Sequence, residues 1–304
     1  KQGVNMSVIA QAGAKGRQLH KFGGSSLADA KCYLRVAGIM KEYSQAGDMM
    51  VVSAAGSTTN QLISWLKLSQ SDRLAAHQVQ QSLRRYHTEL IGGLLEPAAA
   101  DTLIAAFIHD LERLAGLLDG GVSEAVYAEV VGHGEVWSAR LMAAVLNQLG
   151  MEAAWLDARA FLRAERAAQP QVDEGLSYPL LQQLMAQHPN KRLVVTGFIS
   201  RNQAGETVLL GRNGSDYSAT QIGALAGASR VTIWSDVAGV YSADPRKVKD
   251  ACLLPLLRLD EASELARLAA PVLHARTLQP VSASDIDLQL RCSYTPEQGS
   301  TRIE

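Results

Sequence analysis

Four short runs, the first with strand-like alternation and the others rich in apolar and β-branched residues, each end in small or polar residues, a pattern typical of buried parallel strands. The runs are residues 17–22, 49–52, 192–196 and 230–234. Open α/β sheets bind their ligands at the carboxyl ends of such strands. The pattern therefore predicts an α/β fold whose ligand site lies at that edge of the sheet.

Helical spacing dominates between the second and third runs. Across residues 60–147, apolar side chains recur every three or four positions, as in Leu83, Tyr86, Leu90 and Leu94. We interpret these stripes as packing surfaces. Histidine commonly binds metals, but His87, His109 and His133 lie among the stripes without the spacing of metal ligands and are expected to be ordinary surface or core residues.

Three further elements are expected around the apolar runs. Residues 27–42 are compatible with a helix, and the alanine-rich stretch 218–228 predicts another. Residues 198–200 and 207–210 alternate as in a hairpin, with its turn at 202–205. We expect no internal repeat or low-complexity segment.

Composition favours helices packed on a parallel sheet over an aromatic-rich β-sandwich. The chain has 304 residues, of which 47% are hydrophobic and only 5% aromatic, enough for one large domain or two lobes. The net charge is -1, with 29 basic and 30 acidic residues. No basic tract recommends nucleic acid or an anionic membrane as a partner. Any polyanionic ligand must therefore be held by a local site.

Cysteine usage and the chain start bear on location. Cys32, Cys252 and Cys292 are odd in number and far apart, which fits a reducing compartment better than a disulfide framework. No apolar run reaches the roughly 20 residues needed to span a bilayer. Residues 1–16 lack the core of a signal peptide and are expected to be a flexible leader. The chain begins with Lys1, so we expect a processed or recombinant piece, of cytoplasmic origin.

The most informative motif follows the first run. Residues 21–26 read Lys-Phe-Gly-Gly-Ser-Ser. Paired glycines between a strand and a helix let the backbone approach a ligand, and helix N–H groups with a lysine suit a multiply charged phosphate. The alternative is a tight turn with a solvated lysine. The motif is neither the usual phosphate loop nor a dinucleotide fingerprint.

Hydroxyl groups cluster after the second run. Residues 53–60 read Ser-Ala-Ala-Gly-Ser-Thr-Thr-Asn just before a helical stretch. One hydroxyl would suffice to cap that helix. Because four hydroxyls occur in seven residues, we also consider a polar pocket wall.

Arg212 and Asp216 flank a glycine turn in residues 211–218. The arginine suits a carboxylate, which it can bind through two parallel hydrogen bonds. The aspartate stands near a helix start, where the helix dipole favours its charge. A local Arg–Asp ion pair is the simpler alternative.

Two more segments add candidate ligand groups. Residues 234–246 leave the fourth run with Tyr241 for an adenine ring and Arg246 for a phosphate, although such loops are common. Gly132 and Gly134 interrupt a helix, at roughly 1 kcal/mol each, beside Glu135, which would suit an ammonium group. A carboxylate site, an ammonium site and a phosphate site together indicate an amino acid and a nucleotide as ligands.

At these residues the chain resembles the amino acid kinase family and, within it, the aspartokinases. The resemblance is closest to the amino-terminal kinase part of bifunctional aspartokinase–homoserine dehydrogenases of the methionine branch. Nearly the whole chain is covered, in family order, by the motifs at 21–26, 51–54, 134–135, 211–218, 234–246 and 272–278.

The resemblance implies a three-layer α/β sandwich with a mainly parallel sheet and two lobes. Residues 17–200 would form an amino-terminal lobe for aspartate, 201–290 a carboxyl-terminal lobe for ATP, and 291–304 an exit segment toward a regulatory region. A homoserine dehydrogenase half would be fused beyond it, and a homo-oligomer is expected.

The resemblance also implies roles for individual residues. Lys21 and Asp216 would be catalytic, the lysine at the transferred phosphoryl group and the aspartate organising it. The remaining assignments to substrate are Ser53, Thr59, Glu135 and Arg212, and those to nucleotide are Gly23, Gly24, Ser25, Ser235, Asp236, Tyr241 and Arg246. No protein residue is assigned to a metal.

The implied reaction is the Mg²⁺- and ATP-dependent phosphorylation of the side-chain carboxylate of L-aspartate, which opens the pathway to lysine, threonine and methionine. Pro271 departs from the family, because many relatives carry there a lysine that meets ATP phosphate. A kinase for glutamate and a non-catalytic ligand sensor on a kinase fold therefore stay open as alternatives. A NAD-dependent dehydrogenase is disfavoured by the missing dinucleotide fingerprint.

Overall fold

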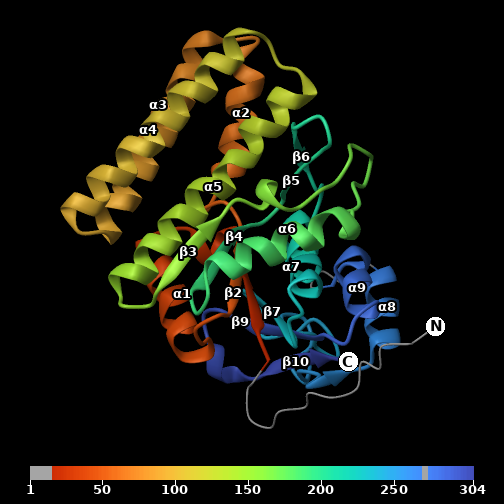
Figure 1. Cartoon of the computed structure of the whole chain (residues 1–304). Coiled ribbons are helices and arrows are strands. Elements are labelled where there is room, and N and C mark those ends of the chain that lie inside the picture. Colours follow the sequence, from red (N-terminus) through yellow and green to blue (C-terminus); the bar gives the residue numbers. More distant parts are fainter. Residues whose placement is uncertain (1–15, 269–272) are drawn as a thin grey trace.

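The computed structural model describes residues 16–268 and 273–304 as three layers around one eight-stranded sheet, shown in Figure 1. The strand order is β3-β4-β2-β1-β7-β9-β10-β8. The strands are β1 (Gln18–Phe22), β2 (Met49–Val52), β3 (Ala153–Leu156), β4 (Arg192–Thr196), β7 (Arg230–Ser235), β8 (Leu256–Leu257), β9 (Asp287–Cys292) and β10 (Ser300–Ile303). All neighbours are parallel except β9 and β10. The predicted α/β sandwich with a mainly parallel sheet is confirmed.

The four predicted strands form the centre of this sheet. Phe22 at the end of β1 pairs with Val52 of β2 and with Trp234 of β7, and Val52 pairs with Thr196 of β4. Because these strands are parallel and in this register, their carboxyl ends lie at one edge. The loops that follow them are therefore neighbours.

Alternate side chains of the strands enter two separate cores. Met50 and Val52 pack into a core with the first helical layer, whereas Met49 and Val51 face the second. Both faces are apolar because both are covered, which explains why these strands read as continuous hydrophobic runs.

The first helical layer confirms the helical interpretation of residues 60–147. Its helices are α1 (Ala30–Tyr43), α2 (Thr58–Ser69), α3 (Arg73–Leu94), α4 (Pro97–Asp119) and α5 (Glu124–Gln148). In Figure 1 the long helices α3 and α4 stand away from the sheet, while α5 runs back along β3 and β4. Gly132 and Gly134 let α5 approach β5 and the loop after β2 closely. A Cβ on Gly132 would lie 2.5 Å from the Ile199 side chain, and one on Gly134 would lie 2.8 Å from the Ala54 side chain.

The second layer consists of α6 (Glu174–Gln187), α7 (Gly214–Leu225) and α9 (Ala275–Ser282), with α8 (Leu259–Arg267) beside α9. The predicted hairpin is confirmed as β5 (Ile199–Arg201) and β6 (Thr207–Leu209). Short 3-10 turns are η1 (Gly24–Leu27), η2 (Ala158–Ala160) and η3 (Pro296–Gln298).

Two of the predicted helices had the wrong bounds. The helix expected over 27–42 begins at Ala30, because η1 comes first and Asp29 caps α1 by accepting from Cys32 N at 2.8 Å. The helix expected over 218–228 is α7, which begins at Gly214 and ends at Leu225. The earlier start places Asp216 within the first turn.

Residues 291–304 contain the end of β9 and all of β10, which pair within the main sheet. Of the predicted leader 1–16, only Gly16 belongs to the described residues. Cys32, Cys252 and Cys292 are all free thiols. No helix in the described parts is long and apolar enough to cross a membrane.

Candidate active site

The loops after β1, β2 and β7 meet at the carboxyl edge of the sheet. Ser53 N donates to Phe22 O at 3.1 Å, and Gly56 N donates to Gly24 O at 3.0 Å, so the loop after β2 is bonded to the loop after β1. We call residues 23–26 the phosphate loop and residues 236–254, which connect β7 to β8, the nucleotide loop. These names refer to the ligand groups expected from the sequence.

Lys21 and Asp216 form a close ion pair at this edge. Nζ of Lys21 lies 2.6 Å from Oδ1 of Asp216, although the contact lacks the alignment of a hydrogen bond. Lys21 and Leu19 share one face of β1, the face against which α7 packs. The fold therefore brings the strand lysine and the helix aspartate together.

The two glycines of the phosphate loop have different environments. A Cβ on Gly24 would lie 2.9 Å from Ala54 O, so the neighbouring backbone already requires a glycine there. A Cβ on Gly23 would instead lie 3.4 Å from Nζ of Lys21. Gly24 thus sets the spacing of two loops, and Gly23 keeps the space beside the ammonium open.

The amide groups of α1 are less available than the sequence suggested. Residues 24–26 of the phosphate loop are themselves part of η1. The carboxylate of Asp29 caps the start of α1. Its hydrogen bonds from Cys32 lower the pKa of Asp29, so that its negative charge is stabilised there. The N–H groups that could face a phosphate are consequently those of η1, within the phosphate loop itself.

The hydroxyl cluster is divided between exposed and buried positions. Ser53 and Thr59 are half-buried, whereas Thr58 is fully buried. Thr58 Oγ1 donates to Ala55 O at 2.6 Å and lies 3.1 Å from Nε2 of His87. Thr58 was not among the predicted site residues, because its contact with His87 of α3 depends on the fold.

Glu135 is the most perturbed acid at this edge. Burial raises the pKa of Glu135 to about 8, against the opposing effects of a hydrogen bond from the Ala54 backbone and of the Lys21 charge. Its Oε2 is buried and has no hydrogen-bond partner among residues 16–268 and 273–304. A buried, unpartnered carboxylate oxygen is an uncommon feature that calls for a ligand or a proton.

Arg212 lies in the turn that leads into α7. The turn is closed by Gly214 N donating to Gly211 O at 2.9 Å, and Asn213 adopts a left-handed conformation with φ 57°. Arg212 is exposed, and its guanidinium pairs with no carboxylate among the described residues. The alternative of a local pair between Arg212 and Asp216 is therefore wrong, because Asp216 pairs with Lys21.

The predicted nucleotide residues extend along a single loop. Ser235 is half-buried at the end of β7, Asp236 is exposed beside it, and Tyr241 is half-buried opposite Leu253. Arg246 is exposed and pairs with Asp244 at 3.1 Å. None of these four side chains contacts Lys21, Glu135 or Arg212 by a hydrogen bond or ion pair in the part of the chain described.

Arg276 is a buried cation near the site that was not among the predicted site residues. The guanidinium of Arg276 donates to Leu210 O and Pro170 O and lies 4.1 Å from the ring centre of Tyr217. These contacts join α9 to the turn before α7. The preceding residues 269–272, including Pro271, lie outside the described residues, so its departure from the family stays a prediction.

A second cluster of charges joins α4, α5 and η2. Arg159 Nη1 lies 2.7 Å from Glu129, and His133 Nε2 lies 3.3 Å from Asp110. Burial alone would raise the pKa of Glu129, but hydrogen bonding to His133 and the Arg159 charge lower it far below its usual range. Every member is paired, so we assign this cluster to structure. His133 and the buried His87 are core residues, as expected.

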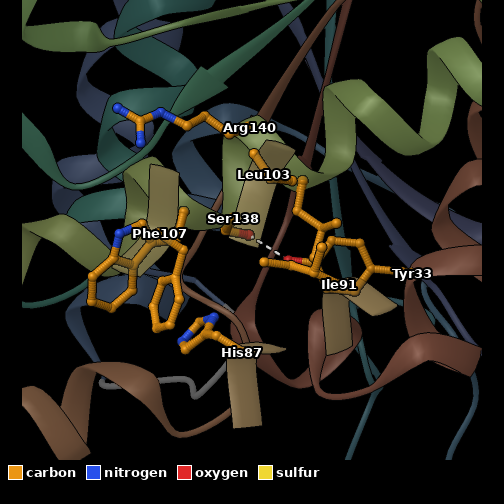
Figure 2. A pocket seen from close by; sticks show the side chains of 9 residues that line it. Tyr33, His87, Ile91, Leu103, Phe107, Ser138 and Arg140 are labelled. Atoms are coloured by element: carbon orange, nitrogen blue, oxygen red, sulfur yellow. Dashed lines mark hydrogen bonds between the residues drawn. The ribbon is translucent and has the colours of Figure 1, made fainter. Parts of the chain in front are cut away.

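A small cavity of about 10 Å³ lies among α1, α3, α4 and α5 (Figure 2). Tyr33 and Ser138 share a hydrogen bond of 2.9 Å at its wall, beside His87 and Phe107. The cavity is too small for a nucleotide or an amino acid and has the size of about one water molecule. It belongs to the helical core and not to the active site.

Comparisons with known proteins show what the whole chain is similar to. The chain is 87% identical over 299 residues to the bifunctional aspartokinase/homoserine dehydrogenase 2 of Escherichia coli K12, covering 98% of this chain and 37% of that protein. It is 32% identical to the lysine-sensitive aspartokinase 3 of the same organism, over 93% of this chain and 63% of that protein.

Solved structures give the same result. The chain superposes on E. coli aspartokinase III in complex with aspartate and ADP with a TM-score of 0.86 and 30% identity, covering 94% of this chain and 64% of that one. The present chain thus spans little more than a third of its bifunctional relative. Because the amino acid kinase family pattern matches residues 16–292, and the fold and relatives agree with it, the chain belongs to the amino acid kinase family.

Proposed function

We propose that this chain transfers the γ-phosphoryl group of ATP to the side-chain carboxylate of L-aspartate, giving 4-phospho-L-aspartate and ADP. The relatives named above are aspartokinases, and the solved structure among them is a complex with aspartate and ADP. The observation that carries the proposal is the Lys21–Asp216 pair at the strand edge, together with the buried Glu135, whose pKa the Lys21 charge lowers. These groups match a reaction between an amino acid and a phosphate.

The acceptor needs no general base. The pKa of an aspartate side chain in water is about 3.9, so the carboxylate is ionised at neutral pH. The barrier comes instead from bringing an anion to a polyanion. Two unit charges about 4 Å apart repel by about 4 kcal/mol at an effective dielectric of about 20. The protein must therefore supply positive charge where the phosphoryl group moves.

Lys21 is the group placed to supply that charge. Its ammonium stands at the end of β1 beside the open face of Gly23, and Asp216 fixes its direction. Asp216 keeps this organising role throughout and removes no proton. A fixed cation of this kind stabilises charge that develops on the transferred group without reorganisation.

The amino acid would bind through its two backbone charges. Arg212 is exposed at the turn before α7 and would hold the α-carboxylate in a bidentate contact. Glu135 would accept the ammonium group on its free oxygen. Ser53 and Thr59, at the start of the adjoining loop and helix, would line the remaining wall.

The nucleotide would lie between the phosphate loop and the nucleotide loop. The residues assigned to it are Gly23, Gly24, Ser25, Ser235, Asp236, Tyr241 and Arg246. Mg²⁺ would be held mainly by phosphate oxygens and water, as it commonly is in phosphoryl-transfer sites. When bound, Mg²⁺ neutralises phosphate charge.

The wider assignments follow the family resemblance of the sequence, and the name of the bifunctional relative supports only the homoserine dehydrogenase part. We propose that residues 17–200 hold aspartate and 201–290 hold ATP, and that the chain is one part of a cytoplasmic, homo-oligomeric protein that also carries a regulatory region and a homoserine dehydrogenase.

The direct test is to incubate the chain with Mg-ATP and aspartate in the presence of hydroxylamine, which traps an acyl phosphate as a hydroxamate. Aspartyl hydroxamate should form, and glutamate in parallel should give far less. Equal trapping of both acids would reassign the substrate. Nucleotide binding without any hydroxamate would favour a ligand sensor.

A further inference from the structure

A short segment near the end of the chain contacts both loops assigned to the nucleotide. Residues 293–301, here called the clasp segment, run from the end of β9 through η3 into β10. Its first residues touch the phosphate loop, and its last residue touches the nucleotide loop. The sequence analysis assigned this segment no role in the site.

Ser293 links the phosphate loop to β7. Its hydroxyl shares a hydrogen bond of 2.8 Å with the hydroxyl of Ser26, and it lies 3.1 Å from Ser235 O. The Ser293 N–H also donates to Ser235 O at 2.8 Å. Ser26 and Ser293 are both fully buried, so water cannot replace the hydroxyl pair without cost.

Tyr294 holds the same loop from outside. Its hydroxyl donates to Ser25 O at 3.3 Å, and its ring carries the guanidinium of Arg35 at 4.4 Å from the ring centre. The ring is partly exposed, so these contacts add to the bond of Ser293 without being part of the core.

Thr301 fixes the nucleotide loop. Its buried hydroxyl accepts from Val240 N at 2.9 Å and donates to Leu254 O at 2.7 Å, which ties the two ends of the loop together. A Cβ on Gly239 would lie only 2.2 Å from Thr301 Oγ1. The close approach of Thr301 therefore requires a glycine at position 239.

We propose that Ser293 and Thr301 are positioning residues for the nucleotide. Neither side chain needs to touch ATP. Each holds one of the two loops through buried hydroxyl bonds, and one short segment thereby sets the separation of the two loops. Loops held in their binding geometry lose less entropy when the ligand binds, which favours affinity. This inference rests on the proposed function.

The main experiment measures the Kd of Mg-ADP by titration calorimetry for wild type, Ser293→Ala, Ser26→Ala and the double variant. Ser293→Ala should raise Kd roughly 2- to 10-fold, the scale of one hydrogen bond. Because Ser26 and Ser293 share that bond, the double variant should be no weaker than the worse single variant. The aspartate KM should stay unchanged.

A matched control removes another buried hydroxyl. Ser177 is also fully buried and accepts from Arg163 N at 2.9 Å, but it lies on α6. Ser177→Ala should lower stability without changing the Kd of Mg-ADP. Thr301→Val, which keeps the side-chain shape, should raise that Kd, and Tyr294→Phe, at an exposed ring, gives a milder variant if Ser293→Ala fails to fold.

The outcomes separate the inference from the proposed function. If the wild-type chain binds Mg-ADP while Ser293→Ala, Thr301→Val and Tyr294→Phe all leave the Kd unchanged, that result would overturn the inference but not the proposed function. Additive effects of Ser26→Ala and Ser293→Ala would also overturn it. A wild-type chain that binds no Mg-ADP would overturn both.

Discussion

Replacing Glu135 with glutamine should make the stability of this protein far less sensitive to alkaline pH. Burial raises the pKa of Glu135 from 4.5 to about 8, so the folded protein holds a proton that the unfolded chain releases. The free energy of unfolding must therefore fall as pH rises from about 4.5 to about 8. Glutamine keeps the shape and the acceptor for Ala54 N but cannot ionise.

The expected size follows from the same pKa. The difference between 4.5 and about 8, at about 1.36 kcal/mol for each pH unit, is roughly 5 kcal/mol and sets an upper limit. Relative to wild type, Glu135→Gln should gain up to this amount of stability between pH 5 and pH 9. Below pH 4.5 the difference between the two proteins should stay constant.

Urea unfolding followed by tryptophan fluorescence at several pH values provides the measurement. Glu89→Gln, at an exposed position on α3, is the matched control and should run parallel to wild type. Parallel curves for Glu135→Gln and wild type would refute the assignment of a raised pKa. With substrate, the aspartate KM of the wild type should fall as pH rises through about 8, because the ammonium group binds the ionised carboxylate.

Three further substitutions test the site. Lys21→Met should lower kcat roughly 10²- to 10³-fold, as expected for the loss of one transition-state contact, and near-normal turnover in steady-state assays would remove Lys21 from the mechanism. Arg212→Ala should raise the aspartate KM about 10- to 100-fold at a nearly constant ATP KM, whereas a changed ATP KM alone would reassign it to the nucleotide. Gly24→Ala should cost about 1–3 kcal/mol in urea unfolding, because its Cβ would meet Ala54 O at 2.9 Å. Gly38→Ala, with nothing within 4 Å in α1, should instead stabilise by about 0.5–1 kcal/mol; equal effects would contradict the packing argument.

The sequence predicted the central strands because their side chains are buried on both faces. The run at 49–52 is apolar throughout, and those at 192–196 and 230–234 are apolar or β-branched after an initial arginine, as expected of central parallel strands. β3 escaped prediction because it reads Ala-Ala-Trp-Leu and lies at the sheet edge, where Trp155 is partly exposed. β9 reads Asp-Leu-Gln-Leu-Arg-Cys, and this alternation of polar and apolar residues matches its half-buried and buried positions.

The site was predictable residue by residue but not as a set of contacts. Glycines and hydroxyls identified the loops, because those residue types carry their own turn and capping chemistry. The partner of Asp216 was not predictable, since Arg212 is close to it in sequence while Lys21 is close to it in space. The buried position of Arg276 and the ion pair of the half-buried Glu129 depend on elements that are distant in the chain.

The strand order has a consequence for biosynthesis. β1 emerges first from the ribosome but occupies the middle of the sheet, and one of its two neighbours, β7, is made much later. Until α7 and β7 have been made, the lysine on β1 lacks its counter-charge Asp216 and one of its two neighbouring strands. Non-local parallel pairing of this kind closes slowly and leaves an open strand edge in the nascent chain. Lys21 would therefore gain its full surroundings only after α7 and β7 have been made and docked.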